Sequence, residues 1–128
     1  MKTDLTRAML DHAAIADLAA DRVFWKRRPK ATPLPAVVLH LVFGDPDETH
    51  DGASGLSRSV VQANCLAASP AEADQLAKAV KAFANDQGDT TLRKIFVGGE
   101  GDLEPAGQTP DTEVFGTRLD LTVWHRKP

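Results

Sequence analysis

The sequence predicts an α+β fold, in which a mainly antiparallel, twisted β-sheet carries helices packed on one face. Runs of strand type follow one another, and one long amphipathic helical pattern, residues 70–86, is inserted among them. The last run, residues 112–126, alternates between apolar and polar residues for about ten positions, as expected of a strand with one buried face. The chain shows no internal repeat and no linker, so residues 1–128 are expected to form one domain.

Helices are expected first, because residues 1–18 are rich in alanine, leucine and methionine. Thr3 or Asp4 can cap a helix that opens at Leu5. Asp11 can cap a second short turn, so this region is expected to form one helix or two short ones.

Residues 22–25 and 36–43 predict two strands that are separated by prolines. Residues 36–43 are apolar nearly throughout, which is typical of a strand that is covered on both faces or lies at a subunit contact. Residues 44–55 contain three glycines and a proline and therefore predict a long loop.

Residues 57–67 predict a strand with one face of small side chains. Val61, Ala63, Cys65 and Ala67 alternate along it and are expected to face the core. Because alanine and cysteine are small, a helix can lie close to this face of the sheet.

The next segment carries the strongest helical signal. Ser69 is a good N-cap, Pro70 suits the first helical position, and Glu72 completes a capping box. Residues 85–88 are expected to end the helix. Its apolar face recurs at helical spacing and consists of Ala73, Leu76, Ala77, Val80, Phe83 and Ala84.

Residues 91–99 predict a further strand that enters a glycine-rich segment, residues 98–101. No Lys-Ser/Thr pair and no helix follow these glycines, so a flexible turn is favoured over a phosphate-binding loop. In the final strand, the apolar set expected to share one face is Phe115, Thr117, Leu119, Leu121 and Val123.

The composition argues against several classes of protein. The net charge is −3, whereas general nucleic-acid binders carry a basic excess. Cys65 is the single cysteine, so no disulfide framework is expected. No apolar run reaches the roughly 18–20 residues of a membrane span, and acidic residues interrupt the N-terminal region, unlike a secretory signal. We therefore expect a soluble protein that is made inside the cell.

Charge is distributed unevenly along the chain. Residues 22–30 form a basic segment and residues 45–51 an acidic one, and each is flanked by prolines. These segments are either solvated loops or contact sites, and the sequence leaves both alternatives open. The roles of Trp25 and Trp124 are also undecided, since each can be an interface anchor or a core residue. The residues expected at an assembly interface are Lys26, Arg27, Arg28, Lys30, Asp45, Asp47, Glu48 and Asp51.

The sequence contains no evident catalytic, cofactor-binding or metal-binding constellation. Residues 47–58 resemble part of a calcium loop, but the twelfth position is Arg58, where a bidentate glutamate is needed. The four histidines lack zinc spacing, and His40, inside an apolar strand, is expected to be a core or interface residue. Cys65 is expected to act as a small buried hydrophobic residue rather than as a nucleophile.

Four segments carry a resemblance to a known family. They are P-x-V-V at residues 35–38, HDGASGLSRSVVQ at 50–62, C-x-A-x-S-x-x-E-A at 65–73 and DLTVWH at 120–125. Their order and spacing resemble the tail-completion, or tail-terminator, family of long-tailed (siphovirus-like) phages and of gene transfer agents. The resemblance covers nearly the whole chain, and none of its segments is a catalytic signature.

The resemblance implies a structural protein of the virion and not an enzyme. Members of the family form a ring, typically of six subunits, that caps the head-proximal end of a finished tail tube and stops its growth. The ring joins the tail to head-completion proteins around an axial channel for DNA. The implied partners are other copies of the chain, the tube protein, the head-completion protein and DNA that passes without sequence-specific binding. The resemblance implies no cofactor and no membrane, and a location in the particle after synthesis in the host cytoplasm.

Other classes of function remain open. Another head–tail connector protein of the same particle is the nearest alternative, because such proteins are also small and form rings. An unrelated non-enzymatic adaptor fits the composition equally well. A small hydrolase would need a triad or an acid–base pair assembled in space. Within the terminator hypothesis, residues 45–51 of one subunit are expected to lie near residues 26–30 of a neighbour or near the tube protein, because the two segments have opposite charge.

Overall fold

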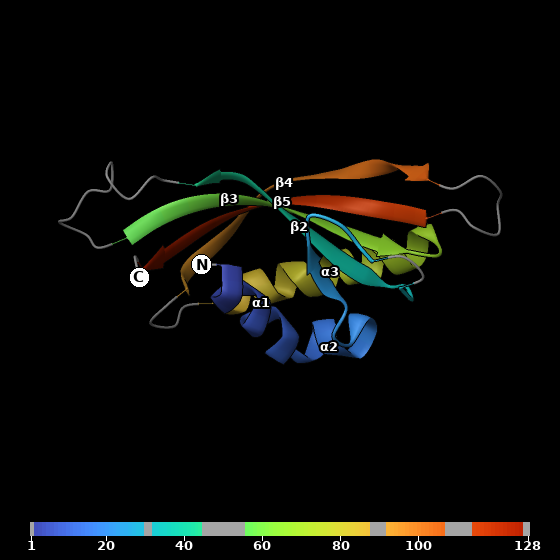
Figure 1. Ribbon diagram of the computed structural model, residues 1–128, viewed down its shortest axis with the longest axis horizontal. Coiled ribbons are helices and arrows are strands. Elements are labelled where there is room, and N and C mark those ends of the chain that lie inside the picture. Colours follow the sequence, from blue (N-terminus) through green and yellow to red (C-terminus); the bar gives the residue numbers. More distant parts are fainter. Residues whose placement is uncertain (1, 30–31, 45–55, 88–91, 107–113, 127–128) are drawn as a thin grey trace.

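One layer of the molecule is a five-stranded sheet and the other consists of helices (Figure 1). The computed structural model describes residues 2–29, 32–44, 56–87, 92–106 and 114–126. Within them the helices are α1 (Lys2–Asp11), α2 (Ala13–Ala19) and α3 (Pro70–Asp86). The strands are β1 (Val23–Trp25), β2 (Ala36–Gly44), β3 (Leu56–Ala67), β4 (Leu92–Ala106) and β5 (Val114–Arg126). The predicted α+β fold is confirmed.

The order of strands across the sheet is β1-β2-β3-β5-β4. β1 runs parallel to β2, and the other neighbouring pairs are antiparallel. Because β5 lies between β3 and β4, it is an interior strand and β4 is an edge strand. All three helices lie on one face of the sheet (Figure 1).

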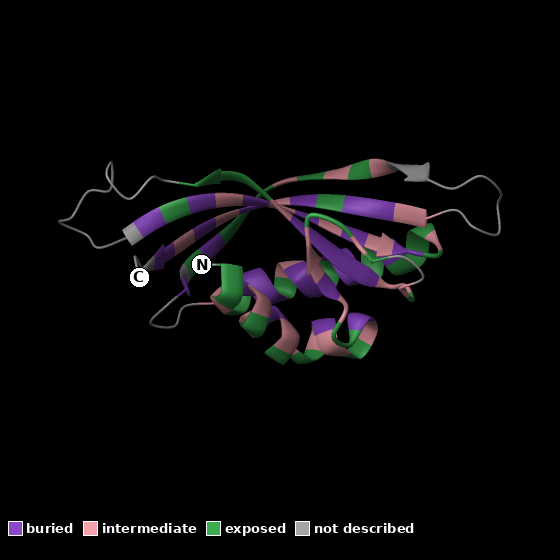
Figure 2. Cartoon of the chain, viewed as in Figure 1, coloured by how far each residue is buried: buried purple, intermediate pink, exposed green. Residues whose placement is uncertain are grey.

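The face of the sheet toward the helices holds the core. Val61, Ala63 and Cys65 of β3 are fully buried, as the alternation of the sequence predicts. Leu121 and Leu119 of β5 lie opposite Val61 and Ala63 and are also fully buried. Figure 2 shows the resulting alternation of buried and less buried residues along both strands.

α3 forms where the sequence predicts it. The Ser69 hydroxyl accepts a hydrogen bond from the Glu72 N–H at 3.3 Å, which satisfies one of the free donors of the first turn. The helix ends at Asp86, and Gln87 is its C-cap. The predicted apolar face is buried, with Ala73, Leu76, Ala77, Val80, Phe83 and Ala84 all at or below 2% exposure.

The N-terminal region forms two short helices, whose starts differ from the prediction. α1 begins at Lys2, earlier than expected, and α2 follows His12, which makes no side-chain cap bond, so Asp11 is not the cap. The Thr6 hydroxyl donates to the Lys2 carbonyl and accepts from the Trp25 indole N–H, both at 2.8 Å. The bond from Trp25 therefore helps to position α1, and α2 forms without a side-chain cap bond.

β4 continues through the glycine-rich segment, so the predicted turn at residues 98–101 is wrong. Gly99 pairs with Asp120 of β5, and the register shifts between Val97 and Gly99, as in a β-bulge. A Cβ atom at Gly99 would lie 3.1 Å from the Asp120 Oδ2 atom. Glycine here permits a close approach to a neighbouring side chain and does not mark a chain reversal.

Candidate assembly surface

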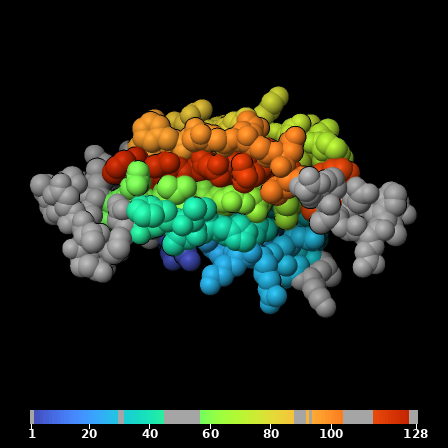
Figure 3. Space-filling view, turned by 90° about the horizontal axis from the view of Figure 1, so that it is seen from above, coloured from blue at the N-terminus to red at the C-terminus, as the bar shows by residue number. Residues whose placement is uncertain are grey.

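The face of the sheet opposite the helices, called the open face below, carries no helix from the described residues. Seen from above, β4, β5, β3 and β2 lie side by side, and their side chains form this surface (Figure 3). The open face is therefore built from the residues that alternate away from the core.

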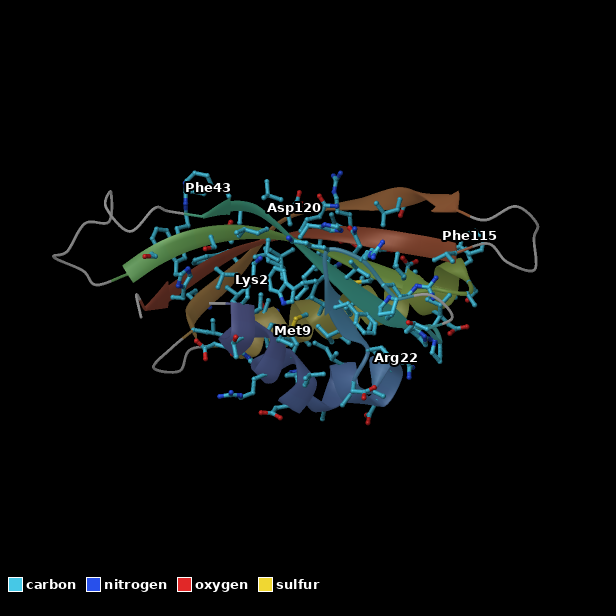
Figure 4. The ribbon with its side chains drawn as sticks, viewed as in Figure 1. Lys2, Met9, Arg22, Phe43, Phe115 and Asp120 are labelled. Carbon is cyan, nitrogen blue, oxygen red and sulfur yellow. The ribbon has the colours of Figure 1, made fainter. Side chains whose placement is uncertain are left out.

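Four paired residues form a row across one end of the open face. Phe43 of β2 lies opposite Val60 of β3, Val60 opposite Thr122 of β5, and Thr122 opposite Phe96 of β4. Phe43 points away from the helices (Figure 4). Phe43 and Phe96 are 43% and 52% exposed, so an aromatic side chain faces solvent at each end of the row.

The next row adds two cations to these aromatic rings. Arg58 lies opposite Trp124, and Trp124 lies opposite Lys94. The Arg58 Cζ atom is 5.2 Å from the centroid of the Phe43 ring, and the Lys94 Nζ atom is 5.6 Å from that of Phe96. Both distances are typical of cation–π contacts. Aromatic side chains combined with arginine are characteristic of protein interfaces.

Large exposed hydrophobic side chains of the described residues lie on only two strands. They are Leu41 (45% exposed), Val42 (61%) and Phe43 (43%) on β2, and Phe96 (52%) and Val97 (37%) on β4. Single exposed hydrophobic residues are common on protein surfaces, but clusters mark interaction sites. The two clusters are candidate contact sites.

Both clusters lie beside open strand edges. β1 pairs with β2 only at residues 37–39, so residues 40–44, the β2 edge, have no strand partner on that side within the described chain. β4 is the last strand of the sheet, so its outer side, the β4 edge, lacks a strand partner among the described residues. Such edges present backbone N–H and C=O groups that can accept a further strand.

Only the first half of residues 36–43 is covered as predicted, and a subunit contact of the second half stays a prediction. Residues 36–39 are buried and residues 41–44 are exposed. His40 lies between them, half-buried and opposite Gln62. The sequence did not indicate where burial ends along this run, because that depends on where the short strand β1 ends.

The predicted interface cations differ in their surroundings. Lys26 and Arg27 are exposed just after β1, whereas the Arg28 guanidinium donates a hydrogen bond to the Thr32 carbonyl and is half-buried. Lys30 lies outside the described residues, as do the predicted anions Asp45, Asp47, Glu48 and Asp51. Their pairing with the basic segment stays a prediction.

The two tryptophans lie on opposite faces of the sheet. Trp25 packs against the core, and the Lys2 Nζ atom lies 5.0 Å from its ring centroid. Trp124 lies on the open face, half-buried between Arg58 and Lys94. Trp25 therefore completes the core, and Trp124 belongs to the candidate surface.

A serine and a histidine meet in space, but inside the core. The Ser59 Oγ atom lies 2.9 Å from the His125 Nε2 atom, and the two residues are 4% and 7% exposed. A catalytic nucleophile must be reached by its substrate. This bond instead satisfies two buried polar side chains, so it gives no support to the hydrolase alternative.

Burial also determines the chemistry of Cys65. Burial raises the pKa of the Cys65 thiol from 9.0 to about 12; the charge of Glu100 adds to this rise and that of Lys81 opposes it. The thiol is therefore protonated at neutral pH and behaves as a small hydrophobic group, as predicted.

Two hollows lie on the surface of the described chain. One, of about 430 Å³, lies where α3 begins, and its wall includes Asp74, Asp102 and Thr117, whose hydroxyl donates to Asp74 at 3.2 Å. The other, of about 400 Å³, lies between α1 and Trp25. Within the described chain, no group of three or more histidine, cysteine, aspartate or glutamate side chains is placed to hold a metal ion.

None of the helices in the described part of the chain combines the length and the apolar character needed to cross a membrane.

The model of the family described as "Tail completion protein gp17" matches residues 3–126. Among solved structures, the chain is similar to a chain of the "Virion of native gene transfer agent (GTA) particle", with 19% sequence identity and a TM-score of 0.49. That similarity covers 94% of this chain and 90% of the other. The search of curated protein sequences found no match.

Proposed function

Because the chain belongs to the tail completion protein gp17 family, and is therefore a structural component of a phage tail, we propose that it is a tail terminator. In this proposal six single-domain subunits form a ring that caps the head-proximal end of the tail tube. The ring stops the growth of the tube. It also joins the tail to the head-completion proteins and leaves an axial channel for DNA.

The observation that carries the proposal is the pair of exposed apolar clusters on β2 and β4. The two clusters are different patches on one chain, and they lie toward opposite edges of the sheet. Contacts between two different patches are head-to-tail contacts, which close into a ring when the rotation between subunits divides the circle. A two-fold dimer would use the same patch twice.

The proposed role requires no reaction. The Ser59–His125 pair is buried, and the Cys65 thiol is buried and protonated. Neither offers a nucleophile that a substrate can reach. We therefore propose a non-enzymatic protein without a cofactor, which acts through the surfaces that it presents to its partners.

Termination follows when the two ends of the ring differ. One end must match the last ring of the tube, and the other must fail to support a further tube ring. The net charge of −3 is consistent with a DNA channel, because a negative wall repels phosphates weakly and does not hold the DNA as it passes.

We further propose that residues 45–51 of one subunit lie near the basic segment of a neighbour or of the tube protein. Their opposite charges support this contact. Exposed ion pairs contribute only about 0–1 kcal/mol each, so the apolar clusters must supply most of the adhesion. Changing Asp45, Asp47 and Glu48 to lysine should reduce the number of tailed particles seen by electron microscopy. Unchanged assembly would exclude this segment from the contact.

The terminator role is tested with particles made with and without this protein. Without it we expect over-long tubes that are not attached to heads, and supplying the unchanged chain should restore normal tails. Tubes of normal length that remain detached from heads would instead favour a head–tail connector. Normal tails that are properly attached would exclude both roles.

A further inference from the structure

We propose that neighbouring copies of this chain join edge to edge, with the β4 edge of one copy pairing antiparallel to the β2 edge of the next. The contact continues the sheet from one subunit to another. It rests on the proposed function, which supplies the ring, and it assigns a second copy of this chain as the partner of each open edge.

The directions of the strands suit this pairing. From β2 to β4 each neighbouring pair of strands is antiparallel, so β4 runs opposite to β2. A rotation about an axis parallel to the strands preserves their directions. β4 of one copy therefore meets β2 of its neighbour in the antiparallel sense, in which adjacent strands form perpendicular hydrogen bonds.

The exposed parts of the two edges also lie at the same position along the strand direction, called the height below. Pairing across the sheet places Phe43 in the same row as Phe96, and His40 in the same row as Gly99. A rotation without translation keeps each row at its height. Phe43 of one copy therefore meets Phe96 of its neighbour, and the open part of β2 lies along the middle of β4.

The exposed apolar side chains are concentrated at this height. Leu41, Val42 and Phe43 lie on the β2 edge, and Phe96 and Val97 lie at the facing level of β4. Edge pairing would pair the open backbone groups and bring these side chains side by side, which covers part of their apolar surface. Each square ångström of apolar surface that is buried contributes about 25 cal/mol of binding free energy. The contact is therefore stabilised by covering the part of the isolated subunit that exposes most apolar surface.

The charges beside the apolar clusters are complementary. On the β1–β2 side of the sheet, Lys26 and Arg27 are exposed, and the Lys26 N–H donates to the Leu39 carbonyl at 2.8 Å, which places them beside the β2 edge. On the other side, β4 presents the exposed carboxylates Asp102 and Glu100, of which Glu100 also pairs with Lys81 of α3 at 2.6 Å. A head-to-tail contact brings cations toward carboxylates.

The test uses disulfide trapping in the full chain, incorporated into particles. A variant with both Phe43→Cys and Phe96→Cys is oxidised and examined on a non-reducing gel. The two positions face each other across the proposed pair, at a spacing that a disulfide can bridge. We expect a ladder of covalent oligomers that ends at six, while each single variant stays monomeric. The native Cys65 does not interfere, because it is fully buried.

Three results would overturn the inference. A covalent dimer from Phe96→Cys alone would show a two-fold contact between β4 edges, and a cross-link to another protein would show that the tube or the head protein occupies the edge. Absence of the ladder from tails of normal length would refute edge pairing while leaving the terminator role intact. If the first pair prevents assembly, Leu41→Cys with Val97→Cys probes the same contact, because Leu41 and Val97 also share a row across the sheet, and the same outcomes apply.

Discussion

Replacing Phe83 with alanine tests the packing between α3 and the sheet, on which the position of every surface residue depends. Phe83 is fully buried, and its ring meets the His12 ring edge to face, with centroids 5.7 Å apart and planes at 83°. Removing the ring loses about 1.5–3 kcal/mol of transfer free energy. The cavity left under the sheet adds to this loss, so we expect the free energy of unfolding to fall by about 3–5 kcal/mol in total.

Chemical unfolding followed by tryptophan fluorescence measures this loss. The midpoint should fall with little change in slope, because the folded state keeps its extent of burial. Phe96→Ala is a matched control, since it makes the same change in a side chain that is 52% exposed on the open face. In the isolated subunit this control should cost less than about 1 kcal/mol.

A loss below about 1 kcal/mol for Phe83→Ala would show that this face of α3 is not the core. Equal losses for the two variants would show that the open face is covered within the subunit. Either result would refute the division of the molecule into a packed face and an assembly face.

Two further predictions concern α3 and Cys65. Ser69→Ala should lower the free energy of unfolding by about 1 kcal/mol, because it removes the acceptor for the Glu72 N–H. Ser69→Gly should lower it by only a few tenths of a kcal/mol. Equal losses for the two variants would show that the cap bond is not the cause. The pKa of Cys65 is raised in the folded chain, so the folded chain keeps its thiol proton at pH values where the unfolded chain has lost it. The contribution of the protonated thiol to stability is therefore present below pH 9.0 and is lost as the pH rises toward about 12. Relative to Cys65→Ala, the free energy of unfolding of the native chain should therefore fall by about 1.4 kcal/mol per pH unit in that range, and parallel pH curves would contradict the assignment.

The elements predicted best from sequence are those whose signal is local. Ser69 and Glu72 mark the start of α3, and alternation along residues 57–67 identifies the buried face of β3. The same reasoning failed at residues 98–101, because glycine is typical both of turns and of close approach between strands. The presence of Asp120 beside Gly99 is a tertiary fact that no local pattern contains.

The candidate surface was only partly predictable for a similar reason. The apolar run at residues 36–43 suggested a subunit contact, but the β4 cluster did not stand out from an ordinary strand. An edge strand can be identified only when the order of strands is known. Phe96 and Val97 lie at an edge because β5 is placed between β3 and β4. The charged segments were visible in the sequence, yet only Lys26 and Arg27 among the described residues are exposed there.

The most direct test of the account is to locate the chain on purified tails by electron microscopy, with a label attached to its C-terminus. We predict label at one end only, the head-proximal end, and a six-fold ring in averaged end-on images. Label along the length of the tube, or at the opposite tip, would contradict the terminator role.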